Sequence, residues 1–287
     1  MNFGEVVTAM VTPFDDENKI NETQLEKLIN HLINNGSDAL IVSGTTGESA
    51  TLTKEEKLNL YKKVVEIVEN RIPVIAGTGT NNTKESIYLT QKAEELGVNG
   101  IMLVTPYYNR PSQKGIYNHF FKVAKATKLP VMLYNVPGRT GIHLEEETVI
   151  SLSKVPNITS LKDASGDLES ISSIISNTPD HFTLYSGDDC LTLPILSIGG
   201  FGVVSVASHI YGHKIKRMIT NYNLGNVTLA AKLHKELLPF MKEIFHAPSP
   251  GPIKFALNNI GVSVGSVRSP LAEVPESIQT SITNLLP

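Results

Sequence analysis

The sequence predicts an α/β protein, a (β/α)8 or TIM barrel with a C-terminal helical appendage, and three observations lead to this fold class. Eight short apolar or β-branched runs recur along most of the 287 residues. Segments with apolar residues at helical spacing separate these runs. Several runs, such as VIAG, IMLVT and VMLY, are apolar at almost every position, which is typical of parallel strands covered by helices on both faces.

The elements alternate in a regular order. After the first run, residues 25–33 place Leu25, Leu28, Ile29, Leu32 and Ile33 on one helical face, and after the second, Leu58, Tyr61, Val65 and Val68 do the same. Repeated units of this kind imply right-handed crossovers, and eight of them close a barrel. A doubly wound open sheet is the alternative, which requires a reversal of strand order that sequence does not display. The expected strands begin near Val6, Ala39, Val74, Ile101, Val131, Thr159, Thr183 and Val203.

The alternation ends near Leu224. We therefore expect residues 1–224 to form the catalytic barrel and residues 225–287 to form a C-terminal helical domain, which contains the helical run LAAKLHKELLPFMKEIF and no convincing strand. The stretch from Cys190 to His213 carries no Asp, Glu, Lys or Arg, but Pro194, Gly199, Gly200 and Gly202 interrupt it. We interpret it as a buried helix, a glycine turn and a buried strand rather than a membrane span.

Composition excludes several classes of protein. Lys and Arg total 25 against 28 Asp and Glu, so the net charge of -3 leaves no basic field for general nucleic-acid binding. Cys190 is the single cysteine, and no cluster of Cys and His has the spacing of a metal site. The start MNFGEVVTAM lacks the features of a secretion signal. We expect a cytoplasmic protein that binds small molecules, with no metal, no nucleic acid and no membrane as partners.

Lys162 directly follows the apolar run ITSL, at the carboxyl end of the sixth expected strand. In a (β/α)8 barrel the active site lies at these strand ends. Strand alternation aims the amine into the mouth of the barrel, where loss of water favours the neutral form that attacks a carbonyl and forms a Schiff base. The alternative is an ion pair with Asp163 or Asp188 at the rim, and position alone does not decide between them.

Neighbouring side chains fit Schiff-base chemistry on a keto acid, which needs a proton carrier and a carboxylate site. Tyr134, one strand away, can place its phenol beside the amine, and Thr45 and Tyr108 can relay its proton. The turn that contains Thr46 offers N–H groups and hydroxyls to a carboxylate. Arg139 follows a Pro-Gly turn, and its planar guanidinium can bind a second carboxylate.

Five segments in the order GTTGESATL, PVIAGTGTN, TPYYNRPSQ, YNVPGRTG and SLKDASGDL resemble the pyruvate-dependent class I aldolase and synthase superfamily. They are most similar to its dihydrodipicolinate synthase family, and the similarity extends from TAMVTPF to GGFGVVSV. The resemblance implies a lyase without cofactor that condenses pyruvate with L-aspartate 4-semialdehyde to 4-hydroxy-tetrahydrodipicolinate. The implied pathway is lysine and diaminopimelate biosynthesis.

The resemblance also implies a role for each site residue. Lys162 forms the Schiff base with pyruvate, and Tyr134 is the general acid and base. Thr45 and Tyr108 complete the proton relay, and Tyr108 reaches into the active site of a partner subunit. The partner implies a homo-oligomer, either a dimer or a tetramer built as a dimer of dimers. The residues expected to bind the two substrates are Thr46 and Val204 for pyruvate and Arg139 for the carboxylate of the semialdehyde.

Some members of the family carry an allosteric lysine site. Lysine-sensitive members have histidines where this chain has Lys54 and Lys57, and extra cationic side chains disfavour a cationic ligand. We therefore expect weak or absent inhibition by L-lysine. The residues that correspond to the site are Ala50, Asn81, Glu85 and Tyr107.

Two other functions could use the same motifs, but they are less consistent with the sequence. N-acetylneuraminate lyase or a sugar-acid aldolase would share Lys162, Tyr134 and the GTTGE turn, but the resemblance implies that those enzymes lack the arginine at position 139. The glycine at position 138, where many synthases have serine, is a small departure. A non-catalytic keto-acid sensor would not need the complete proton relay.

Two further motifs do not support a site. Residues 261–265, GVSVG, match the nucleophile elbow of hydrolases, but no histidine follows them. His209 and His213 are four residues apart without a third ligand, so we interpret them as structural or surface residues.

Overall fold

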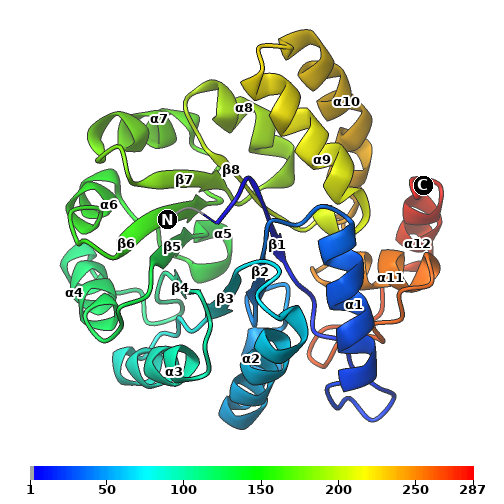
Figure 1. Cartoon of the computed structure of the whole chain (residues 1–287), viewed down its shortest axis with the longest axis horizontal. Coiled ribbons are helices and arrows are strands. Elements are labelled where there is room, and N and C mark those ends of the chain that lie inside the picture. The colour runs from blue at the N-terminus through cyan, green and yellow to red at the C-terminus, as the bar shows by residue number, and fades with distance from the viewer. Residues whose placement is uncertain (1–2) are drawn as a thin grey trace.

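The computed structural model describes residues 3–287, and its strands form one closed barrel in the order β1 to β8, with every neighbouring pair parallel (Figure 1). This confirms the predicted fold class and excludes the open doubly wound sheet. Each strand begins within one residue of its predicted start. The strands are β1 Val6–Ala9, β2 Ala39–Val42, β3 Val74–Gly77, β4 Gly100–Val104, β5 Val131–Asn135, β6 Ile158–Asp163, β7 Thr183–Ser186 and β8 Gly202–Ser205.

Helices surround the barrel and separate consecutive strands (Figure 1). Residues 225–287 contain helices and no strand, and there α11 and α12 pack on each other and on α9 and α10. The helices are α1 Glu22–Asn34, α2 Lys54–Val68, α3 Thr83–Glu95, α4 Gln113–Ala124, α5 Pro137–Thr140, α6 Glu146–Leu152, α7 Leu168–Asn177, α8 Thr192–Ser197, α9 Ser208–Asn223, α10 Val227–Glu243, α11 Gly251–Asn259 and α12 Glu276–Thr283, with short 3-10 turns η1 Ser49–Thr51 and η2 Asp189–Leu191.

Local sequence explains where α2 begins and which face it buries. Thr53 and Glu56 form a reciprocal capping box that satisfies two backbone N–H groups of the first turn. Its buried stripe consists of Leu60, Tyr61, Val64 and Val68, with Lys57 at one end, so two of the predicted positions, Leu58 and Val65, lie at the margin and are only half-buried. In α1 the predicted stripe is confirmed, except that Ile33 is only partly buried.

The inside of the barrel is packed with side chains from alternate strand positions, and its amino end is closed by Phe3. The Phe3 ring lies against Gly100, where an added Cβ would approach a ring atom to 2.5 Å, so only glycine fits. The Phe3 amide donates a hydrogen bond to the buried Tyr185 hydroxyl at 3.2 Å. The barrel interior is therefore a filled core, and only its carboxyl end is available for a site.

The uncharged stretch from Cys190 to His213 contains η2, α8, a glycine turn, β8 and the start of α9. All four residues of β8 are buried, and α8 buries Thr192, Ile195 and Leu196. The interpretation as buried helix, turn and strand is thus confirmed. Within residues 3–287, no helix is long and apolar enough to cross a membrane.

His209 lies fully buried near the start of α9 and joins the exits of β1 and β8. Its Nε2 accepts a hydrogen bond from the Val11 amide at 3.2 Å, and its Nδ1 lies 2.8 Å from the Val206 carbonyl oxygen. An acceptor at Nε2 leaves the proton on Nδ1, which donates to Val206. The structural interpretation of this histidine is confirmed, and burial lowers the pKa of His209 to about 4.

We expect acid to destabilise the protein through His209. The folded state holds the pKa of this histidine at about 4, whereas the unfolded chain binds a proton near pH 6.5, so the free energy of unfolding falls as the pH falls through this window. Between pH 7 and pH 5 the loss from His209 is about 2 kcal/mol. Chemical denaturation at the two pH values measures it. His209→Gln, which keeps a donor and an acceptor but does not titrate, should remove this part of the pH dependence, and His181→Gln at an exposed position should not. An unchanged slope in His209→Gln would show that this histidine does not sense pH.

Candidate active site

The side chains of Lys162 and Tyr134 lie together at the carboxyl ends of β6 and β5. The two residues are direct partners in the parallel register, and each is 5% exposed. The Lys162 Nζ lies 4.0 Å from the centroid of the Tyr134 ring, over its face. The aromatic face stabilises a cation when the amine is protonated. The predicted proximity of these two residues is confirmed.

The carboxylates that could have paired with Lys162 bind elsewhere. Asp163 Oδ2 accepts from the Asn135 side-chain amide at 2.8 Å, and Asp163 Oδ1 accepts from the Ser165 amide at 2.8 Å. Asp188 accepts from the Cys190 amide at 2.8 Å. Within residues 3–287, neither carboxylate forms an ion pair with Lys162. A carboxylate beside a buried amine would stabilise the protonated form, which is not a nucleophile. Because neither of these two carboxylates pairs with Lys162, the structure favours the Schiff-base interpretation over the rim ion pair.

Asn135 and Asp163 support the site, although the sequence prediction assigned no role to Asn135 and considered Asp163 only as an alternative ion-pair partner of Lys162. They follow Tyr134 and Lys162 directly, so strand alternation turns their side chains to the outer face, where they bind each other. The Asn135 side-chain oxygen also accepts from the Leu144 amide at 3.1 Å. This contact ties the segment after α5 to the two strands that carry Lys162 and Tyr134. The adjacency in sequence was the signal that could have identified them.

The turn after β2 is rigid and carries Thr45 and Thr46. Thr46 is 5% exposed and Thr45 is half-buried. Inside the turn the Glu48 amide donates to the Thr45 carbonyl at 3.0 Å, and the Thr12 hydroxyl donates to the Gly47 carbonyl at 2.7 Å. A Cβ at Gly47 would lie 3.1 Å from the Met10 carbonyl oxygen, a tight contact with the backbone that favours glycine there. This turn opens on the same end of the barrel as Lys162.

Val204 and Arg139 differ in their surroundings. Val204 on β8 is 1% exposed and belongs to the interior cluster that also contains Tyr134, which agrees with a position beside a small substrate. Arg139 lies in the single turn of α5, which begins with Pro137 and ends at Gly141 in the left-handed region. Its side chain is exposed. It is thus available to an anionic group that enters from the carboxyl end of the barrel.

Tyr108 is not brought to the other site residues within one chain. It is 88% exposed and has a φ of 70°, a conformation that residues other than glycine rarely adopt. The loop around it is held against the segment before α3, because the Asn81 side-chain amide donates to the Tyr107 carbonyl at 3.2 Å and the Asn109 side-chain amide donates to the Asn81 carbonyl at 2.9 Å.

Of the four residues expected at the allosteric site, Asn81, Glu85 and Tyr107 lie together around this loop. Lys54 lies 3.5 Å from the Glu85 carboxylate. Burial and the nearby Glu85 carboxylate raise the pKa of Tyr107, and burial lowers the pKa of Lys57, an effect that Glu85 opposes and Lys54 reinforces. Ala50 is exposed in η1. The single carboxylate of this cluster therefore already faces two lysines.

The structure describes no metal centre. Among residues 3–287, no group of three or more His, Cys, Asp or Glu side chains is arranged to hold a metal ion. The chemistry that the described side chains offer is that of an amine, two phenols, hydroxyls and a guanidinium.

Comparison with known proteins adds to this geometry. A family model described as the dihydrodipicolinate synthetase family matches residues 2–287. A protein of Bacillus subtilis named 4-hydroxy-tetrahydrodipicolinate synthase is 56% identical over 287 residues, which cover 100% of this chain and 99% of that protein. A protein of Oceanobacillus iheyensis with the same name is 54% identical over 286 residues, covering 100% and 97%.

Solved structures that are similar to this chain are also dihydrodipicolinate synthases. A dihydrodipicolinate synthase of Bacillus anthracis superposes with a TM-score of 0.98 at 50% identity, covering 99% of this chain and 98% of that one. A structure from Cyanidioschyzon merolae with lysine bound gives a TM-score of 0.97 at 47% identity, covering 99% and 97%. A third, described as a monomeric dihydrodipicolinate synthase variant, gives 0.96 at 38% identity, covering 99% and 95%. With this agreement over its full length, the chain belongs to the dihydrodipicolinate synthetase family.

Proposed function

We propose that this protein is a lyase that condenses pyruvate with L-aspartate 4-semialdehyde through a Schiff base on Lys162. The product is 4-hydroxy-tetrahydrodipicolinate, and the reaction serves lysine and diaminopimelate biosynthesis. The observation that carries the proposal is the buried Lys162 amine, which lies against the Tyr134 ring at the carboxyl end of the barrel and forms no ion pair with a carboxylate among residues 3–287. The names of the full-length relatives support the choice of substrates.

In the proposed mechanism, the two substrates combine into the product and release one water molecule. The neutral Lys162 amine attacks the keto carbon of pyruvate, and the resulting carbinolamine loses water to form the Schiff base. Loss of a proton from the pyruvate methyl group gives an enamine, whose carbon forms a bond to the aldehyde carbon of the semialdehyde. The amino group of the semialdehyde then attacks the Schiff-base carbon and displaces Lys162, which closes the ring and releases the product.

Each remaining site residue has a proposed role in this sequence. Tyr134 acts as general acid and base, and Thr45 and Tyr108 relay its proton to solvent. The turn at Thr46 binds the pyruvate carboxylate through N–H groups and a hydroxyl. The remaining contacts are those of Val204 with pyruvate and of Arg139 with the carboxylate of the semialdehyde.

Sodium borohydride trapping tests the proposal. Borohydride reduces a Schiff base to a stable amine, so intact-protein mass spectrometry should show one reduced pyruvate per chain when pyruvate is present and none when it is absent. A coupled assay with aspartate semialdehyde then tests the acceptor. Folded protein that forms no adduct would contradict the Schiff-base mechanism and favour a keto-acid sensor.

We further propose a homo-oligomer in the cytoplasm, either a dimer or a tetramer of two dimers. The exposed Tyr108 supports a partner subunit, since its role in the relay requires a second chain. The unpaired Cys190 supports a reducing compartment. Within each chain, residues 1–224 form the catalytic barrel and residues 225–287 the helical domain, a division supported by the break between α9 and α10.

L-lysine is expected to inhibit this enzyme weakly or not at all, although Asn81, Glu85 and Tyr107 lie together. Lys54 already lies 3.5 Å from the Glu85 carboxylate and Lys57 adds a second positive charge, so a cationic ligand meets like charges. A steady-state assay with increasing L-lysine measures this. Clear inhibition below about 1 mM would mean that the two lysines do not repel the ligand strongly enough to matter.

A further inference from the structure

The turn that carries Thr45 and Thr46 is held from behind by a buried carboxylate. The Glu48 side chain is 1% exposed, and its Oε1 lies 2.7 Å from the Nζ of Lys254 in α11, whose side chain is 2% exposed. This is a charge contact without hydrogen-bond geometry at Oε1. Lys254 also donates to the Ser266 carbonyl at 2.7 Å. The buried Glu48 carboxylate is therefore compensated by Lys254, a residue that follows the barrel in sequence.

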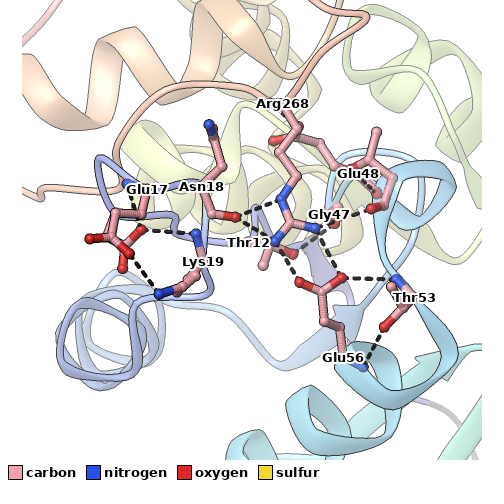
Figure 2. Close-up of polar contacts among 11 residues, drawn as sticks. Thr12, Glu17, Asn18, Lys19, Gly47, Glu48, Thr53, Glu56 and Arg268 are labelled. Carbon is pink, nitrogen blue, oxygen red and sulfur yellow. Dashed lines mark hydrogen bonds and ion pairs between the residues drawn. The ribbon is translucent and has the colours of Figure 1, made fainter.

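A second contact from the C-terminal segment reaches the same carboxylate. The Arg268 backbone amide donates to Glu48 Oε2 at 2.9 Å (Figure 2). The Arg268 guanidinium binds Glu56 in α2 with both ends of its fork, and its other donors reach the carbonyls of Asn18 and Thr51. The guanidinium lowers the pKa of Glu56 by these hydrogen bonds. The segment around Arg268 is thus fixed to the barrel on both sides of the turn.

Phe14, just after β1, completes the arrangement. Lys254 Nζ lies 4.1 Å and Arg268 Cζ lies 4.2 Å from the centroid of its ring. The Phe14 amide donates to the Val264 carbonyl at 3.1 Å, and a Cβ at Gly265 would lie 2.1 Å from the Phe14 carbonyl oxygen. Two cations on one aromatic ring and a close backbone contact leave little freedom to this segment.

The pair of Glu48 and Lys254 is better suited to position the turn than to stabilise the fold. A buried ion pair contributes little to stability relative to apolar residues of the same size, because both charges lose their hydration. Glu48 itself has a φ of 55°, in the left-handed region, so its backbone conformation persists only if its surroundings hold it. It lies two residues after Thr46. What the pair supplies is therefore the conformation of the turn.

We infer that Lys254 and Glu48 are positioning residues, through which the C-terminal helical segment holds the turn of residues 44–49 in the form that binds the carboxylate of pyruvate. The inference rests on the proposed function, because it takes the turn as the pyruvate site. Because both side chains are buried, we assign neither of them a contact with the substrate.

Titration of the borohydride adduct with pyruvate tests the inference in the full-length protein. In Glu48→Gln and in Lys254→Met, the pyruvate concentration for half-maximal adduct should rise about tenfold, whereas saturating pyruvate should still label the folded chains fully. The KM for aspartate semialdehyde should change less than about twofold, because Arg139, on a different loop, binds its carboxylate. The matched controls are Glu17→Gln and Lys19→Met, an exposed ion pair on the same side of the protein, which should leave both values unchanged (Figure 2).

A double variant separates positioning from the cost of an unpaired charge. Glu48→Gln with Lys254→Met leaves no buried charge uncompensated, so it should fold even where a single variant folds poorly. Its half-saturating pyruvate concentration, which does not depend on the folded fraction, should stay raised. A return to the wild-type value, or an equal loss for both substrates, would overturn the inference. A wild-type protein that forms no adduct would instead overturn the proposed function, and the inference with it.

Discussion

Replacing Lys162 with alanine is expected to abolish the pyruvate adduct and to lower kcat by about 10⁴-fold or more, because the covalent route depends on this amine. Steady-state kinetics with both substrates measures the loss, and borohydride trapping shows whether the adduct is absent. The control is Lys154→Ala, at an exposed lysine just before β6, which should retain wild-type activity.

The structure predicts that the Lys162→Ala protein still folds. Lys162 contacts the face of the Tyr134 ring, and the nearby Asp163 is satisfied by Asn135 and Ser165, so the substitution leaves no buried carboxylate without a partner. Circular dichroism and the melting temperature check this. A folded variant that keeps more than a small fraction of its activity would place the nucleophile elsewhere.

Tyr108→Phe is expected to lower kcat by about 10²-fold, although the residue is 88% exposed in a single chain. The change removes only the hydroxyl, which the proposed relay uses to carry a proton, and leaves the aromatic ring for packing. Kinetic assays of the purified variant measure the effect. Tyr88→Phe, at another exposed tyrosine in α3, is the matched control and should behave as wild type. Full activity in Tyr108→Phe would exclude the relay across subunits.

Mixed oligomers test which subunit uses Tyr108. A Lys162→Ala chain retains Tyr108, and a Tyr108→Phe chain retains Lys162, so a mixed dimer contains one complete site only if Tyr108 acts in the partner. Random mixing of the two inactive chains should then recover about a quarter of wild-type activity. If mixing recovers nothing, Tyr108 acts within its own chain.

Much of the barrel was predictable because its pattern is local. Each strand is a short apolar run, and burial on both faces makes that run visible without knowledge of its neighbours. The same regularity places side chains such as Lys162 at strand ends, and the register then brings Tyr134 beside it. The prediction of the α2 stripe was less accurate at Leu58 and Val65, because neighbouring helices decide how wide a buried face is.

The supports of the site were not predictable from local pattern. Adjacency to Tyr134 and Lys162 could have marked Asn135 and Asp163 as candidates, but the contact between their side chains depends on the register of β5 and β6. Local pattern also did not predict the exposure and the strained backbone of Tyr108, because both come from the loop that Asn81 holds.

By itself, then, the sequence determined the repeated strand and helix units, the amine at the end of β6 and the residue types of a keto-acid site. Only the tertiary structure decided that Lys162 pairs with no carboxylate in the described part of the chain and that Arg268 meets Glu48, a residue 220 positions away. The physical reason is that periodicity records which face of an element is buried. Whether distant charges pair depends on how the folded chain brings residues far apart in sequence together, and no short segment encodes this.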